Sequence, residues 1–119
     1  MFEEKTKWKK LGLIFAPKTE YWWMRTHAMN PTPVLINEGP LVRIYFSGRD
    51  EHNRSQPGWV IINLEDPRKF EEMSQEPIMS LGRLGTFDDN GIAPISIVDL
   101  GEKVYLYYVG FKPGGTTRM

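Results

Sequence analysis

The chain has 119 residues, with 15 basic and 15 acidic side chains and no cysteine. This length suits one ordinary domain, and a hydrophobic fraction of 40% beside 25% charged residues excludes a disordered chain. The balanced charge offers no basic surface for nucleic acid or an acidic membrane, and the lack of cysteine excludes disulfide scaffolds, cysteine-ligated zinc and thiol catalysis. The N-terminus lacks the apolar core of a signal peptide and no apolar stretch approaches a bilayer span, so we expect a cytoplasmic soluble protein.

Short stretches rich in Val, Ile and aromatic residues alternate with Gly and Pro along the chain, which predicts an all-β fold. The expected strands, in chain order, are 11–15, 32–36, 42–46, 59–64, 92–98 and 104–109. The second and third of these strands flank loop 37–40, and the last two flank loop 99–102. Both loops contain the Gly that longer hairpin connections use, so each pair of strands is predicted to form a hairpin.

One stretch between the hairpins favours a helix. Asp66 is a good capping residue, Pro67 suits the first helical position, and Phe70 and Met73 would then share a face. We expect one or two turns at most, ending near residues 75–77.

The two predicted hairpins resemble each other in sequence. The stretch NPTPVLINEGPLVRIYFSG at 30–48 corresponds to APISIVDLGEKVYLYYVG at 93–110, so that Tyr45 aligns with Tyr107 and Gly48 aligns with Gly110. The alignment defines a repeat period of about 62 positions, and a period of this kind built from short strands is typical of a repeat architecture. Four-stranded propeller blades are the natural all-β choice.

The chain holds about 1.9 such repeats, whereas a propeller needs roughly four or more blades to close. We therefore expect a partial β-propeller domain over 1–119, with about two four-stranded antiparallel blades, the second incomplete. Its expected parts are a lead-in over 1–28, a first repeat over 29–90 and a truncated second repeat over 91–119.

An aromatic and polar segment leads into the first hairpin. Trp22 and Trp23 have faces that can stack on sugars, and His27 and Asn30 can hydrogen-bond to sugar hydroxyls at the mouth of a channel. The alternative is structural, because adjacent tryptophans more often fill the space under a loop and a lone histidine is more often a satisfied structural residue.

A dense polar segment follows the second strand of the first hairpin. Arg49 and Arg54 can clamp a carboxylate, a phosphate or a vicinal diol, and Asp50 can hold one of them in place. The alternative is a solvated turn with an ion pair of little energetic value.

Two neighbouring carboxylates, Asp88 and Asp89, precede the second hairpin. Adjacent carboxylates raise each other's pKa, and one that stays protonated near neutrality can serve as a general acid. Neighbouring residues entering a strand point to opposite sides, so only one of the pair is expected to face a channel. The alternative is a turn, since Asp-Asp-Asn-Gly is a typical turn sequence.

No sequence signature of a nucleotide-binding loop, a dinucleotide fold, a serine nucleophile or a zinc protease is present. His27 and His52 are too few and too far apart in sequence to suggest zinc, so we expect neither a metal nor a cofactor.

Nearly the whole chain resembles the N-terminal part of five-bladed β-propeller glycosidase-like proteins, which are related to arabinanases, invertase-like hydrolases and family 130 mannoside phosphorylases. The segments that carry the resemblance are HAMNPTPVL, RIYFSGRDEHNRSQPG, PIMSLGRLGTFDDNGIAPISIV and VYLYYVGF. The resemblance implies a central funnel that binds a saccharide between the inner strands of successive blades. It also implies a carbohydrate partner and, for the phosphorylases, phosphate.

Two positions depart from the pattern of those enzymes. Asn30 stands where arabinanase-like enzymes carry a general-base Asp, and Ala93 stands where the phosphorylases carry an acid Asp, with Asp89 four residues earlier. The leading hypothesis is a protein that hydrolyses or phosphorolyses glycosidic bonds, with Asp89 as the acid and Asp88 and Asp50 as orienting groups.

Two alternatives remain open. In the first, the propeller binds carbohydrate without catalysis, which the residues at 30 and 93 favour. In the second, the chain is a structural fragment that associates with other copies through its exposed strand edges.

Overall fold

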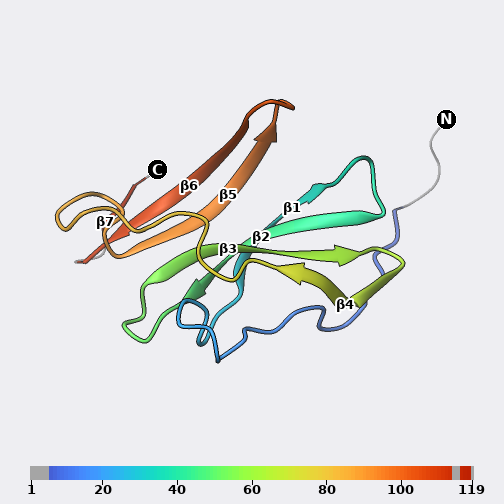
Figure 1. Cartoon of the computed structure of the whole chain (residues 1–119), viewed down its shortest axis with the longest axis horizontal. Helices are drawn as coiled ribbons and strands as arrows, with labels where there is room; N and C mark the ends of the chain where they lie inside the picture. Colours follow the sequence, from blue (N-terminus) through green and yellow to red (C-terminus); the bar gives the residue numbers. More distant parts are fainter. Residues whose placement is uncertain (1–5, 114–115, 119) are drawn as a thin grey trace.

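The structure, a computed structural model, describes residues 6–113 and 116–118, the last three as backbone only. The described residues form seven strands and no helix, which confirms the all-β class (Figure 1). In chain order the strands are β1 (Met29–Leu35), β2 (Leu41–Arg49), β3 (Ser55–Asn63), β4 (Asp66–Met73), β5 (Gly91–Asp99), β6 (Val104–Lys112) and β7 (Thr116–Arg118).

The first four strands form an antiparallel meander in which each strand pairs with the next along the chain. The longest ladder joins β2 to β3, from Leu41 opposite Asn63 to Arg49 opposite Ser55. The predicted hairpin of 32–36 with 42–46 is confirmed as β1 and β2. The predicted strand 59–64 is the second half of β3, which begins four residues earlier at Ser55.

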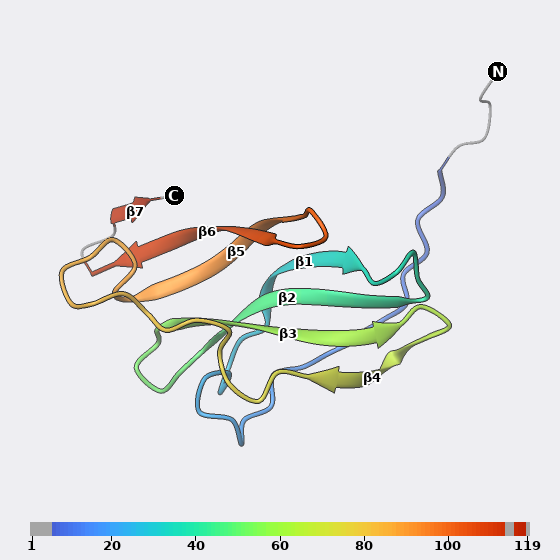
Figure 2. The same cartoon turned by 45° about the horizontal axis from the view of Figure 1, so that its top comes forward.

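The next three strands form a second antiparallel unit, in which β5 pairs with β6 and β6 with β7. The predicted hairpin of 92–98 with 104–109 is therefore also confirmed. Within the described residues the two units share one parallel residue pair, Ser55 beside Gly91, which joins them into one mixed sheet. In Figure 2 the β5–β6 hairpin lies as a second layer beside β1 and β2, and β1 and β5 are in contact.

The internal repeat is visible in how two glycines pack. Gly48, near the end of β2, lies under Met24, and an added Cβ would come within 2.6 Å of the Met24 side chain. Gly110, near the end of β6, lies in the same way under Phe87 and Asp88. In both units the segment that precedes the first strand crosses the second strand at this aligned position, where only a glycine leaves room.

The hydrophobic core lies between the first meander and the lead-in. Its buried members are Trp23, Met24, Phe46, Val60 and Met73, against which Phe15, Tyr21, Ile44 and Phe70 pack. The predicted strand 11–15 is wrong, because this stretch pairs with no strand among the described residues. Phe15 packs on the core instead, 5.3 Å from Phe46 and 5.8 Å from Phe70, ring centre to ring centre, whereas Leu11 and Leu13 are exposed.

The predicted helix after Asp66 is also wrong, because the residues form the edge strand β4. Phe70 lies opposite Ile62 and Met73 lies opposite Val60, with an irregularity in the register between these pairs. An extra residue in one strand places positions three apart on the same face, which in the sequence imitates the helical period. Pro67 is tolerated because an edge strand needs no further donor on its open side.

Candidate functional site

Three connecting segments meet at one end of the sheet, because β1 and β5 begin there and β2 and β6 end there. Met29 lies opposite Ser47, and Ser55 lies beside Gly91, so the starts of β1, β3 and β5 are neighbours. We call this the loop end and define it as residues 20–28, 50–54 and 74–90. Every residue predicted for the site lies at the loop end or on the strand residues next to it.

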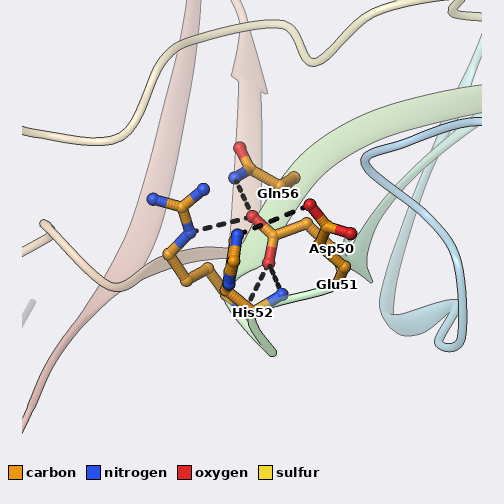
Figure 3. A network of polar contacts seen from close by, with 5 residues as sticks. Asp50, Glu51, His52 and Gln56 are labelled. Atoms are coloured by element: carbon orange, nitrogen blue, oxygen red, sulfur yellow. Dashed lines mark hydrogen bonds and ion pairs between the residues drawn. The ribbon is translucent and has the colours of Figure 1, made fainter.

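Asp50 is the hub of the β2–β3 loop (Figure 3). Its Oδ1 accepts hydrogen bonds from the backbone N–H groups of His52 and Arg54, both at 2.9 Å. Its Oδ2 accepts from Arg54 Nε at 2.9 Å and from Gln56 Nε2 at 3.1 Å. The side chain of Asp50 is only 2% exposed, so these four donors take the place of water.

The electrostatics of Asp50 follow from this shell of donors. Burial by itself would raise the pKa of Asp50, but the hydrogen bonds from Arg54, Gln56 and His52 outweigh it and hold the pKa below its ordinary value. A carboxyl group that stays ionised and fully bonded does not donate a proton near neutral pH. Asp50 therefore orients its loop and Arg54, which agrees with the orienting role predicted for it.

The hollows at the loop end meet at two side chains, Trp22 and Arg54. The larger has a volume of about 360 Å³ and is also lined by Gln56, Glu76, Pro77, Met79, Ser80 and Leu81. The smaller, of about 170 Å³, is also lined by Arg25, Asp50, Glu51 and His52. The Trp22 side chain is 49% exposed, and its indole N–H donates to Glu76 Oε2 at 2.9 Å, which fixes the ring beside both hollows.

The neighbouring tryptophan has the opposite environment. Trp23 is completely buried, stacks on Phe46 at 5.6 Å between ring centres, and donates its indole N–H to the Gln75 carbonyl at 3.0 Å. It has no surface that can meet a ligand. The predicted sugar-stacking role is therefore wrong for Trp23, which is a core residue.

Asp88 and Asp89 lie in the turn over 87–90 that precedes β5, as the turn alternative predicted, and the two side chains have different surroundings. Asp88 is buried, accepts from the Tyr108 hydroxyl at 2.8 Å through Oδ2, and lies 3.2 Å from the Thr86 hydroxyl through Oδ1. Asp89 accepts from the Gly85 backbone N–H at 2.8 Å through Oδ2, whereas its buried Oδ1 has no hydrogen-bond partner among the described residues. Burial, then the hydrogen bond and negative charge of Asp88, raise the pKa of Tyr108.

The three remaining predicted residues, His27, Asn30 and Arg49, lie next to the start of β1 and the end of β2. His27 is exposed, with its Nδ1 2.7 Å from the Thr26 hydroxyl oxygen. Asn30 is exposed at an irregular position of β1 and has a φ of 56°. Arg49 donates through Nη1 to Asn53 at 3.2 Å, and its buried Nε has no partner among the described residues. These side chains do not line the hollows at Trp22 and Arg54.

Sequence reasoning missed four contributors: Arg25, Gln56, Glu76 and Tyr108. Arg25 and Glu76 line the hollows, Gln56 completes the shell of Asp50, and Tyr108 binds Asp88. For Gln56 a local signal exists, because it lies two residues beyond the predicted Arg54. Glu76 carries no local signal, since it reaches Trp22 across 54 residues of sequence.

Over the described part of the chain, no group of three or more His, Asp and Glu side chains is placed to hold a metal ion. The same residues contain no helix long and apolar enough to cross a membrane.

Two uncharacterized proteins of Mycobacterium tuberculosis are similar to the chain: MT1551 of strain CDC 1551 / Oshkosh and Rv1502 of strain ATCC 25618 / H37Rv. Each is 49% identical to it over 104 residues, which are 87% of this chain and 34% of the relative. The chain thus spans about a third of the length of the curated relatives it matches. No family model matches the chain, and no solved structure matches it.

Proposed function

We propose that the chain forms the carbohydrate-binding part of a glycosidase-like β-propeller, with the ligand held at the loop end. The observation that carries the proposal is the half-exposed indole of Trp22, fixed by Glu76, as a shared wall of two adjoining hollows. An aromatic face beside convergent hydrogen-bonding groups is the arrangement that sugar rings and their hydroxyls require.

Arg54 is the second shared wall and complements the indole. Its Nε is bonded to Asp50, which fixes the guanidinium, while the remaining N–H groups have no hydrogen-bond partner within residues 6–113 and can meet a ligand hydroxyl. Glu76, Gln56 and Ser80 add acceptors and donors on the larger hollow. Because both signs of charge line the hollows, a neutral saccharide fits them better than a free anion does.

The propeller part of the proposal is supported by the repeated antiparallel unit. The first unit has the four successive strands of a propeller blade, and the second repeats its first hairpin one repeat period later. The lengths agree as well: 104 residues are 34% of each relative, so each relative has about 300 residues (104/0.34), which is close to five times the period.

The test is binding of neutral manno- and arabino-oligosaccharides to the chain, measured by titration calorimetry and by tryptophan fluorescence. Wild-type chain is expected to bind, and Trp22→Ala to bind at least roughly tenfold more weakly, because the stacking face is lost. Trp8→Ala is the matched control, since Trp8 is exposed and lines neither hollow. Failure of the wild type to bind, or equal binding by Trp22→Ala, would refute the proposal.

A catalytic role is the second candidate, and one observation favours it. The Oδ1 atom of Asp89 is buried without a hydrogen-bond partner among the described residues, unlike the oxygens of Asp50. A carboxyl oxygen without a partner can carry the proton of a general acid, but because this one is buried it needs a path to the substrate. Glycosidic cleavage needs a second group on the opposite side of the bond, and Asn30 offers an amide where the resembling arabinanases have a carboxylate.

A further inference from the structure

A separate hollow lies between the lead-in and β4, and we call it the β4 hollow. Its volume is about 370 Å³, which is in the range of small-molecule pockets. Its lining combines apolar side chains with cationic ones, chiefly Leu13, Phe15 and Phe70 on the apolar side and Lys18, Arg68 and Lys69 on the cationic side. It shares no lining residue with the hollows at Trp22 and Arg54.

The β4 hollow differs from the other hollows in the charge of its walls. Three basic side chains line it and, within the described residues, no acidic side chain does, although β4 carries acidic residues at 66, 71 and 72. The hollows at the loop end include Asp50, Glu51 and Glu76, and a hollow of about 150 Å³ between the two hairpins includes Asp99. In a chain of zero net charge, three positive charges around one hollow favour an anion there.

Two of the three cations are held in place by the fold. Arg68 Nε donates to the Leu11 carbonyl of the lead-in at 2.9 Å, while its other guanidinium nitrogens have no hydrogen-bond partner within residues 6–113. The Lys18 ammonium lies over the rings of Phe15 and Phe70, 5.9 Å and 5.1 Å from their centres. Because these groups are already positioned, an anion that meets them has less side-chain entropy to offset.

The charges of the β4 hollow are not used in ion pairs. None of Lys18, Arg68 and Lys69 forms a salt bridge within the part of the chain that the structure describes. Arg68 offers a planar fork and the two lysines offer point charges, and both kinds of group are common phosphate ligands. The neighbouring apolar walls offer contact area to an uncharged part of the same ligand.

We propose that the β4 hollow binds a small phosphate monoester that has an apolar body. A phosphate monoester carries about 1.5 to 2 negative charges near neutral pH, so it matches three cations better than a singly charged carboxylate does. The phosphate would meet Lys18, Arg68 and Lys69, and the apolar body would contact Leu13 and Phe15. This site is independent of the carbohydrate site proposed at the loop end, because the two have no residue in common.

The probe for this site is phenyl phosphate, titrated into isotopically labelled chain and followed by NMR of the backbone amides. We expect the resonances of residues 13–18 and 68–70 to shift. Phenyl phosphate is expected to bind at least about fivefold more tightly than inorganic phosphate, which has no apolar body, and than benzoate, which carries a single charge.

One lysine on β4 provides a variant that should still fold. Lys69 is exposed, and its side chain makes no hydrogen bond or ion pair within the described residues, so Lys69→Gln removes a charge from the hollow and leaves the packing intact. We expect it to weaken phenyl phosphate binding at least about threefold. Lys103→Gln is the matched control, because it makes the same change at an exposed position between β5 and β6 and should leave the affinity unchanged.

The absence of shifts at 13–18 and 68–70, shifts that gather at Arg25 and Arg54 instead, or equal effects of Lys69→Gln and Lys103→Gln would overturn the inference. Equal affinity for benzoate would also overturn it. Binding to phosphatidylcholine vesicles that contain phosphatidic acid, without binding to phenyl phosphate, would make a lipid surface the source of the anion and overturn it as well. Trp22→Ala should bind phenyl phosphate as the wild type does, so failure of carbohydrate binding leaves this inference standing.

Discussion

Replacing Asp50 by Asn tests whether this residue organises the loop end. The exchange keeps the size of the side chain but removes its charge and turns one acceptor into a donor. Asn Oδ1 can still accept from the backbone N–H groups of His52 and Arg54, but its amide nitrogen would then face Arg54 Nε and Gln56 Nε2, which are both donors. If the amide turns by half a rotation, its nitrogen instead faces the two backbone N–H groups, which are also donors.

The expected loss in the free energy of unfolding is about 2 to 4 kcal/mol, because two hydrogen bonds to a charged acceptor are lost in a side chain that is almost completely buried. Each of these bonds contributes roughly 1.5 kcal/mol or more. Breaking a buried ion pair costs about 3 to 5 kcal/mol, but Arg54 is partly exposed, and solvent screening reduces that contribution.

Urea denaturation followed by tryptophan fluorescence measures the change, with an unchanged m-value as the condition for comparing midpoints. Glu51→Gln is the matched control, because Glu51 is exposed and, within the described residues, its one ion pair is with His52, at 3.5 Å. We expect the control to stay within about 0.5 kcal/mol of the wild type. A loss for Asp50→Asn no larger than that of the control would refute the hub role.

The sign of the pH dependence provides a second check on Asp50. Its pKa is lowered in the folded chain, so its contribution is present above the unfolded pKa, near 4, and is lost as the pH falls through the folded value. The difference in unfolding free energy between wild type and Asp50→Asn should therefore be constant near neutrality and shrink below about pH 4. A difference that grows on acidification would contradict this reasoning.

Two further substitutions test the second repeat. Tyr108→Phe removes the hydroxyl that satisfies buried Asp88, so we expect a loss of about 1 to 3 kcal/mol in urea denaturation. Because the pKa of Tyr108 is raised, the difference in unfolding free energy between wild type and Tyr108→Phe should be full below about pH 10 and should decline as the pH rises further. A difference that stays undiminished at high pH would contradict this reasoning. Asp89→Asn should lower any turnover of aryl mannosides or arabinosides by roughly 10²- to 10⁴-fold, and undiminished turnover would exclude Asp89 as the acid.

The hairpins could be predicted from the sequence because their signals are local. Alternating apolar residues mark the strands, and the glycines at 39 and 101 adopt the positive φ values that the connecting loops require. The edge strand β4 could not be predicted in the same way. The irregular register that puts Phe70 and Met73 on one face produces the spacing of a helix, and only pairing with β3 resolves the ambiguity.

The site shows the same division between local and distant contacts. The contact of Asp50 with Arg54 was expected, since both lie in one short loop. The roles of Trp22 and Trp23 could not be separated, because they depend on Glu76 and Gln75, which lie far away in the sequence. Both tryptophans lie in a turn that the Met24 N–H closes on the Tyr21 carbonyl at 3.2 Å, so no strand alternation marks which of them faces the core.

The loop end uses most of its described carboxylates for structure, and this favours one of the two proposed roles over the other. Asp50 is saturated by four donors, and Asp88 is engaged by Tyr108, so neither is free to transfer a proton. Of Asp50, Asp88 and Asp89, only Asp89 has a carboxyl oxygen, Oδ1, that is buried without a hydrogen-bond partner among the described residues. One such oxygen would supply only half of the acid and base pair that glycosidic cleavage requires, whereas the proposed binding role needs only groups that already line the hollows, Trp22 and Arg54. The proposed binding role therefore asks less of this chain's own residues than the proposed catalytic role does.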